Sequence, residues 1–219
     1  LMETLVGLSG IPILLNTKDT EEIIAAVAAI SPTFAAIQLE DISAPRCFEI
    51  EERLQAMLDI PVLHDDQHGT AVVCTAALLV ATRETGTDLN KAVIGQIGLG
   101  AAGHAIGVMM MRLTGNPVYG ADLSPEALDR FEKAGGKKSN LKEIMEKCDI
   151  VIATTGAPNL IKPEMVRMGQ IILALSNPNP EIDPDVAMEH GAAFAADGKS
   201  VNNVLGFPGI FRGAVDANA

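Results

Sequence analysis

The chain has 219 residues, of which 48% are hydrophobic, and its 16 basic and 28 acidic side chains give a formal net charge of −12. This acidic balance excludes binding through a nucleic-acid backbone or to an anionic membrane surface, because both need surplus lysine and arginine. No apolar run reaches the roughly 18–20 residues that span a bilayer, and three widely spaced cysteines favour a reducing cytoplasm over a disulfide framework.

Short apolar runs alternate with helical patterns along the chain, which is typical of βαβ units and a parallel sheet. The apolar runs predict strands at residues 11–15, 34–39, 60–63, 91–97, 117–121, 150–153, 170–175 and 193–195. The helical patterns predict helices at residues 19–30, 45–58, 69–85, 105–113, 183–190 and 210–215. We therefore expect an α/β fold.

A glycine-rich turn lies between the predicted strand at 91–97 and the helix that follows it. Its sequence is Gly98-Leu99-Gly100-Ala101-Ala102-Gly103, and Asp122 ends the next predicted strand. The three glycines suit a tight turn, close approach of a pyrophosphate and close helix–strand packing, and a carboxylate about 20 residues further on suits an adenosine ribose. The alternative is an ordinary βα turn, but strand, helix and acid in register favour a Rossmann-like, doubly wound parallel sheet that binds a dinucleotide. Asp122 favours NAD over NADP because a carboxylate repels a 2′-phosphate.

Two further polar turns follow predicted strands. Thr154-Thr155-Gly156 comes after residues 150–153, and Ser176-Asn177-Pro178 comes after residues 170–175. The carboxyl ends of parallel strands are where an open α/β sheet binds its ligands. The alternative is that these residues only end strands, since Gly, Pro and Asn favour turns for conformational reasons.

Acidic residues gather at the ends of two earlier strands. Glu40 and Asp41 end one, and the segment from His64 to Thr70, with Asp65 and Asp66, follows another. Such carboxylates could converge on Mg²⁺ or Mn²⁺, which suit an all-oxygen site, or they could cap a helix and face water. No third nitrogen or thiolate has zinc-ligand spacing, and the Asn202-Asn203 pair near the end of the chain could form a turn or a polar site.

Taken in order, these motifs are similar to those of malic enzymes of the shorter bacterial type. The blocks are Thr17-Lys18-Asp19-Thr20-Glu21-Glu22, Leu39-Glu40-Asp41-Ile42-Ser43-Ala44-Pro45, His64-Asp65-Asp66-Gln67-His68-Gly69-Thr70-Ala71, the Gly98 turn, Leu175-Ser176-Asn177-Pro178 and Asn202-Asn203-Val204. They are spread over nearly the whole chain, and the acidic blocks are the most specific among them.

The resemblance implies NAD(P)-dependent, divalent-metal-dependent oxidative decarboxylation of malate to pyruvate and CO₂. Glu40, Asp41 and Asp66 match the metal ligands, and Asn177 and Asn203 match the asparagines that hold the substrate carboxylates. The segments that match dinucleotide-binding residues are Asp65, Thr70, Gly98, Leu99, Gly100, Ala101, Ala102, Gly103, Asp122, Thr154, Thr155 and Gly156. NAD is the expected cofactor, with NADP as the alternative, together with Mg²⁺ or Mn²⁺.

The family's catalytic lysine base and tyrosine acid have no match in this sequence. Tyr119 is the only tyrosine and lies inside a predicted strand, and Lys18 belongs to a different motif. We expect both groups upstream of Leu1, in a protein of which this chain is a fragment lacking an N-terminal part and the C-terminal end. Two alternatives stay open: a malolactic-type enzyme that converts malate to lactate with bound NAD, and a non-catalytic module that binds NAD or malate.

The resemblance also implies a domain organisation. Residues 1–63 would form a metal- and substrate-side α/β segment, residues 64–202 the NAD-binding Rossmann-like domain, and residues 203–219 a return to the first domain. We expect a cytoplasmic homodimer or larger homo-oligomer that acts on a small molecule and binds neither nucleic acid nor membrane.

Overall fold

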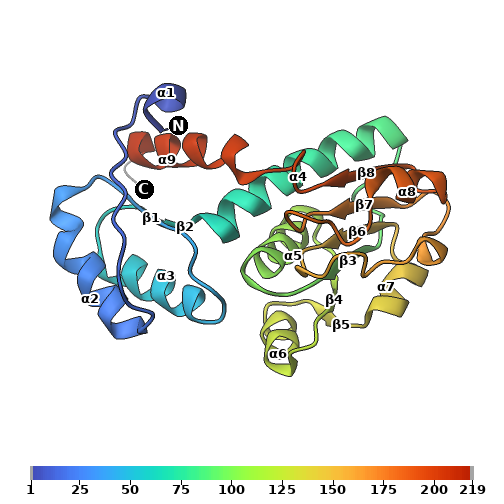
Figure 1. Ribbon diagram of the computed structural model, residues 1–219, viewed down its shortest axis with the longest axis horizontal. Helices are drawn as coiled ribbons and strands as arrows, with labels where there is room; N and C mark the ends of the chain where they lie inside the picture. The colour runs from blue at the N-terminus through green and yellow to red at the C-terminus, as the bar shows by residue number, and fades with distance from the viewer. Residues whose placement is uncertain (1, 218–219) are drawn as a thin grey trace.

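A six-stranded parallel sheet dominates the computed structural model, which describes residues 2–217 (Figure 1). Its strands are β3 (Ile94–Ile97), β4 (Tyr119–Ala121), β5 (Lys137–Lys138), β6 (Ile150–Ala153), β7 (Ile171–Ala174) and β8 (Phe194–Asp197). Their order is β5-β4-β3-β6-β7-β8, so the order reverses between β3 and β6. This is the doubly wound arrangement, in which the crevice at the reversal binds ligands. The predicted α/β fold with a Rossmann-like sheet is confirmed.

Helices cover both faces of this sheet. One face packs against α4 (Asp65–Thr85), α5 (Ala101–Thr114) and α6 (Pro125–Lys133). The other face packs against α7 (Leu141–Lys147) and α8 (Pro184–Glu189). Within β6, Ile150 and Ile152 face the first layer while Val151 faces the second, as the two-residue period of a strand requires. Because both faces are covered, β6 and β7 are apolar throughout, and β3 is apolar except for the buried Gln96.

A smaller parallel pair of strands forms the second part of the molecule. β1 (Ile37–Leu39) pairs with β2 (Val62–His64), and α2 (Thr20–Ile30) and α3 (Arg46–Met57) pack beside them around a separate apolar core. The remaining elements are α1 (Met2–Val6), η1 (Ser31–Thr33), η2 (Pro163–Met165), η3 (Asn203–Leu205) and α9 (Phe207–Ala217). Of the helices in residues 2–217, none is both long and apolar enough to cross a membrane.

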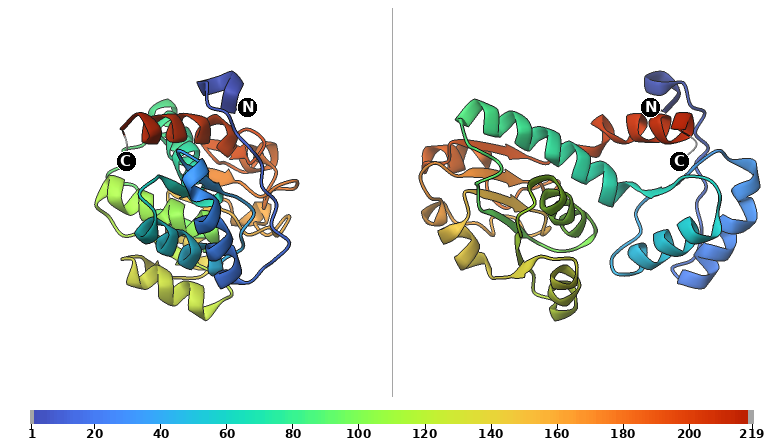
Figure 2. Two further views of the ribbon diagram at one scale, coloured as in Figure 1. Left: turned by 90° about the vertical axis from the view of Figure 1, so that its left-hand side faces the viewer. Right: turned by 180° about the vertical axis from the view of Figure 1, so that it is seen from behind.

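The two parts are joined by α4, which begins at the end of β2 and runs along the large sheet (Figure 1). The chain returns at its end, because α9 lies beside α1 and the start of α4 (Figure 2). The Arg212 Nη1 atom of α9 donates a hydrogen bond to the Val6 carbonyl of α1 at 3.3 Å. The division of the chain at residues 63 and 202 stays a prediction.

The structure departs from the predicted elements in several places. Residues 11–15 form no strand, and that prediction is wrong: Ile11 and Leu14 are exposed, and no strand of the described chain lies alongside to accept their backbone hydrogen bonds. The helix expected at 69–85 begins at Asp65, and the helices α1, α6 and α7 and the strand β5 were not predicted. For α6 the signal was present, since Ser124 caps it and Pro125 occupies its first turn.

Candidate functional site

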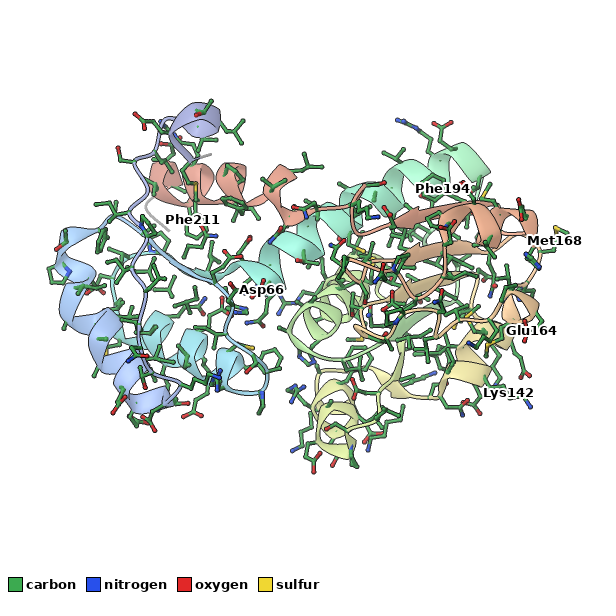
Figure 3. The ribbon with its side chains drawn as sticks, in the orientation of Figure 1. Asp66, Lys142, Glu164, Met168, Phe194 and Phe211 are labelled. Carbon is green, nitrogen blue, oxygen red and sulfur yellow. The ribbon has the colours of Figure 1, made fainter. Side chains whose placement is uncertain are left out.

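A cavity of about 290 Å³ opens beside the carboxyl ends of β6 and β7, near the start of α4. Asp66, at the start of α4, lies between the two parts of the molecule (Figure 3) and lines this cavity. The residues that line the cavity are Asp66, Thr70, Ala102, Thr154, Leu175, Ser176, Asn177, Val201, Asn202 and Asn203. It therefore brings together residues from α4, α5, two strand-end turns and the segment entering η3.

The glycine turn at the start of α5 has the shape that a pyrophosphate needs. Gly98 has a φ of +86°, which favours glycine, and a Cβ at Gly103 would lie 1.9 Å from the Gly98 carbonyl oxygen. A Cβ at Gly100 would meet nothing within 4 Å. Gly100 is the N-cap of α5, so the open space lies where backbone N–H groups and the helix dipole attract anions.

Asp122 is held against this turn. One of its carboxylate oxygens accepts a hydrogen bond from the Leu99 N–H at 2.6 Å, and the other accepts one from the Ser124 N–H at 2.8 Å. Asp122 thus lies at the glycine turn, as a ribose-binding acid would, but outside the lining of the cavity.

Four carboxylates gather where β1 and β2 end. Asp41 donates a backbone hydrogen bond to Asp66 Oδ2 at 3.1 Å. Burial, followed by the negative charges of Asp66 and Asp41, raises the pKa of Glu40 against the lowering effect of its hydrogen bond from Gln38. Burial, with the charges of Glu40 and Asp66, raises the pKa of Asp65 to about 7. The group therefore concentrates negative charge that a cation would relieve.

The acids are of the chemical type that binds a divalent cation. Asp65 Oδ1 is buried and has no hydrogen-bond partner among the described residues, and the donors are all oxygens, as Mg²⁺ and Mn²⁺ prefer. Across residues 2–217, however, no three His, Cys, Asp or Glu side chains converge closely enough to ligate a metal. The carboxylate oxygens are suitable ligands for the cation. The side chains would have to change conformation to bind it together.

Neighbouring groups fix the segment that carries Asp65 and Asp66. The buried Glu51 of α3 accepts hydrogen bonds from the His64 N–H at 2.7 Å and from Gln67 Nε2 at 2.9 Å. The N-cap of α4 is His64 and makes no side-chain cap, so Asp65 and Asp66 are first-turn residues and do not cap the helix. Acids in the first turn complement the helix dipole.

The two asparagines that the sequence singled out both reach the cavity. Asn203 Nδ2 donates to Asp65 Oδ2 at 2.5 Å, and Asn177 Nδ2 donates to the Gly198 carbonyl at 3.1 Å. Each keeps a second N–H and its carbonyl oxygen for a ligand. Their neighbours Asn202 and Ser176, which the sequence analysis did not assign to the site, line the same cavity.

The cavity gathers only part of the predicted set. Its lining includes the predicted Asp66, Thr70, Ala102, Thr154, Asn177 and Asn203. Glu40, Asp41 and Asp65 belong to the acid group beside it, while Thr155 and Gly156 are not among the lining residues and donate hydrogen bonds to Glu181 and Ser176 respectively. Glu181 is a fully buried carboxylate that no sequence motif marked.

Comparison with known proteins confirms the resemblance to malic enzymes. Residues 15–55 match the family model "Malic enzyme, N-terminal domain". The NAD-dependent malic enzyme 1 of Bacillus subtilis is 62% identical over all of this chain and 50% of its own length. The bifunctional malic/malolactic enzyme of the same organism is 40% identical over all of this chain and 58% of its own length.

Solved structures show the same relationship. The crystal structure of a NAD-dependent malic enzyme from Thermotoga maritima superimposes with a TM-score of 0.90 at 36% identity, covering all of this chain and 64% of that one. The chain spans about half the length of the first curated relatives it matches.

Proposed function

We propose that this chain, which belongs to the malic enzyme family, supplies the metal-side and dinucleotide-binding parts of an enzyme that oxidatively decarboxylates malate to pyruvate and CO₂. One observation carries the proposal: a single cavity is lined by Asp66 of the proposed metal site, by the proposed substrate-binding residues Asn177 and Asn203, and by Ala102 of the glycine turn. In one cavity, the asparagines would bind a dicarboxylate, Asp66 a cation, and the residues at the glycine turn a nicotinamide dinucleotide.

In this proposal Asn177 and Asn203 donate hydrogen bonds from their amide groups to the two carboxylates of malate. Both side chains line the cavity, and each is held from behind, by Gly198 and Asp65 respectively. A substrate amide contact is precise only when the side chain is already fixed, so these bonds orient malate before reaction.

Glu40, Asp41 and Asp66 would hold Mg²⁺ or Mn²⁺. A bound ion would supply Lewis acidity toward the substrate hydroxyl and the developing negative charge, and bound NAD would supply the hydride acceptor. The hydrogen bond from the Asp41 N–H to Asp66 keeps the segment after β1 next to the start of α4, so the two acids stay together.

We propose NAD as the preferred cofactor, on the strength of Asp122. The open space at Gly100 accepts the pyrophosphate at the start of α5, and Asp122 beside it accepts hydrogen bonds from the ribose. A carboxylate at that place disfavours the 2′-phosphate of NADP.

The proton-transfer groups are proposed to lie in sequence outside this chain. Tyr119 lies in β4 beneath the Lys137 ammonium, 5.5 Å from the ring centre, and does not line the cavity. Lys18 precedes α2 in the smaller part of the molecule. The lysine base and tyrosine acid, the homo-oligomer and the cytoplasmic location all stay predictions.

The test is to titrate the purified chain with NAD⁺, and with malate in the presence of Mn²⁺, by calorimetry, and to assay it for NADH and products. We expect saturable binding of both ligands, and no NADH formation in the absence of the segment that carries the proposed lysine base and tyrosine acid. Robust NADH formation by this chain alone would contradict the placement of the base and acid. Lactate without net NADH would favour the malolactic reaction, and the absence of binding would contradict the proposal.

A further inference from the structure

Glu181 is a fully buried carboxylate that none of the steps above uses. It follows the turn after β7 and precedes α8, and its own backbone is fixed by a hydrogen bond from the Ile161 N–H to the Glu181 carbonyl at 3.0 Å. The adjacent Asn159 N–H bonds the Pro180 carbonyl at 3.2 Å. The side chain therefore projects from a rigid base.

The carboxylate of Glu181 accepts four hydrogen bonds, and all come from the two strand-end turns. From the turn after β6, Thr155 donates its N–H at 2.6 Å and its hydroxyl at 2.8 Å, both to Oε1. From the turn after β7, Ser176 donates its hydroxyl to Oε1 at 2.5 Å and its N–H to Oε2 at 3.3 Å. The Ser176 oxygen in turn accepts the Gly156 N–H at 2.8 Å, which closes the network.

The charge at Glu181 is compensated by these hydrogen bonds alone. Within the described chain, no lysine, arginine or histidine forms an ion pair with it. A buried carboxylate without a cation is very costly unless its hydrogen bonds are satisfied. Movement of either turn would break bonds to a buried charge, so the carboxylate opposes movement of the two turns relative to each other.

These two turns carry the two halves of the site. Thr154 precedes Thr155 on the cofactor side, and Asn177 follows Ser176 on the substrate side, and both line the cavity. Thr155 and Ser176 are thus each one step along the chain from a residue that lines the cavity.

We infer that Glu181 is a positioning residue that couples binding of the dinucleotide to binding of the dicarboxylate. This inference rests on the proposed function, since it takes those two ligands as the occupants of the cavity. Because Glu181 holds both turns, a ligand that orders one turn also orders the other, and each ligand raises the affinity for its partner. By linkage, the enhancement is the same in both directions.

The first experiment needs no ligand. Glu181→Gln preserves size but replaces one accepting oxygen by an NH₂ group, which cannot accept the N–H of a turn. Amide hydrogen exchange of Thr155, Gly156, Ala157 and Ser176 should quicken at least tenfold in this variant. Glu189→Gln, at an exposed glutamate in α8, is the matched control and should leave these rates unchanged. Faster exchange at only one turn, or at neither, would overturn the inference.

The second experiment measures coupling, using NAD⁺ and the malate analogue oxalate with Mn²⁺. In the unaltered chain we expect saturating NAD⁺ to tighten oxalate binding about fivefold or more, and in Glu181→Gln we expect this factor to fall to one. Thr155→Val should also lower the factor and add nothing in the Glu181→Gln background, while Thr155→Ser, which keeps the hydroxyl, should restore it. Retained coupling in folded Glu181→Gln would overturn the inference.

The outcomes separate this inference from the proposed function. If the unaltered chain binds neither NAD⁺ nor oxalate, the proposed function fails, and the ligand-free exchange rates still decide whether Glu181 holds the two turns together. If Glu181→Gln fails to fold, Thr155→Val tests the same hydrogen-bond network by hydrogen exchange and by the coupling measurement. Unchanged exchange at Ser176 in that variant would contradict the inference.

Discussion

Asn203 of η3 donates a hydrogen bond to Asp65 at the start of α4, at 2.5 Å and across 138 positions of sequence. A Cβ at Gly69, one helical turn along α4, would lie 2.0 Å from Asp65 Oδ1 and 3.3 Å from the Asn203 Cβ. The glycine therefore makes room for the contact. Through it, the segment that returns from the large sheet is fastened to the acids at the end of β2, so the proposed substrate and metal residues occupy one fixed frame.

The metal assignment makes a prediction about stability. In the unaltered chain Mn²⁺ should raise the melting temperature, since a ligand at 100 times its Kd stabilises a fold by about 2.7 kcal/mol. Asp66→Asn keeps an oxygen that accepts the Asp41 N–H bond but removes the charge. The variant should fold and lose the Mn²⁺-induced rise, as seen by differential scanning fluorimetry.

The control for this measurement is Asp59→Asn, at an exposed acid just before β2. It should retain the full rise in melting temperature. A full rise in Asp66→Asn would show that the carboxylate is not a ligand.

The position of Asp122 makes a prediction about cofactor choice. Asp122→Ala removes the proposed ribose contact and also the acceptor of the Leu99 and Ser124 N–H groups. Loss of such an acceptor costs about 1–3 kcal/mol of stability. The informative quantity is therefore the ratio of the Kd values for NAD⁺ and NADP⁺, measured in one variant by calorimetry. We expect NAD⁺ affinity to fall more than NADP⁺ affinity, and an unchanged ratio would remove Asp122 from the ribose role.

Much of the large sheet could be predicted because its determinants are local. The strand at 150–153 and the turn at Gly98 have their own signals: an apolar run in one case, and in the other glycines at positions where a Cβ would collide or a positive φ is needed. The sites at strand ends followed from topology alone, since parallel strands bring their carboxyl ends to one edge.

The parts that were not predicted depend on distant partners. The run at 11–15 has the composition of a strand, but a strand needs a neighbour, and local sequence does not state whether one is present. Glu181 was missed for a similar reason. It follows Pro180 in a polar segment where an exposed acid is the ordinary expectation, and its burial depends on Thr155 and Ser176, which are 26 and 5 positions away.

The arrangement of the acid group also lay beyond the sequence. The resemblance to malic enzymes grouped Glu40, Asp41 and Asp66 as metal ligands, and the structure brings these acids near one another without making them converge on a point. Spacing along the chain fixes where a backbone passes, whereas side-chain rotamers respond to charge, and mutually repelling carboxylates have no reason to converge without a cation.

The glycine turn offers a paired test of fold against function. Gly103→Ala would place a Cβ 1.9 Å from the Gly98 carbonyl oxygen and 2.7 Å from Thr154 Oγ1. Forcing an atom into packed backbone typically costs about 1–3 kcal/mol, so denaturant unfolding should show a clear loss of stability. Gly100→Ala meets nothing within 4 Å at a φ of −66°, so its cost should be limited to about 0.5–1 kcal/mol, because alanine is a poorer N-cap than glycine.

NAD⁺ binding should be affected in the opposite sense: Gly100→Ala, the substitution with the smaller effect on stability, should weaken it strongly. The empty space at Gly100 is where the pyrophosphate is proposed to lie, so Gly100→Ala should weaken NAD⁺ binding at least tenfold while the fold persists. If Gly100→Ala bound NAD⁺ normally, the dinucleotide could not approach this turn as proposed.

His104 makes the stability of the chain depend on pH. Its ring lies between those of Phe48 and Phe131, with ring centres 5.3 Å and 5.9 Å away, and so joins α3 of the smaller part to α5 and α6. Burial, and then the positive charge of Arg130, lowers the pKa of His104 to about 4. The unfolded chain, with a histidine pKa near 6.5, thus binds a proton in a range where the folded chain does not.

The sign of the effect follows from this difference. The contribution of His104 to stability is fully present above pH 6.5 and is lost as the pH falls from about 6.5 toward 4. The Asp65 carboxyl, with its pKa raised to about 7, acts in the opposite direction over an overlapping range. The free energy of unfolding should therefore be compared between the unaltered chain and His104→Phe, which keeps a ring in the stack. As the pH falls from 6.5 to 4.5, the unaltered chain should lose more stability than the variant. A difference between them that stays constant would show that folding does not lower the pKa of His104.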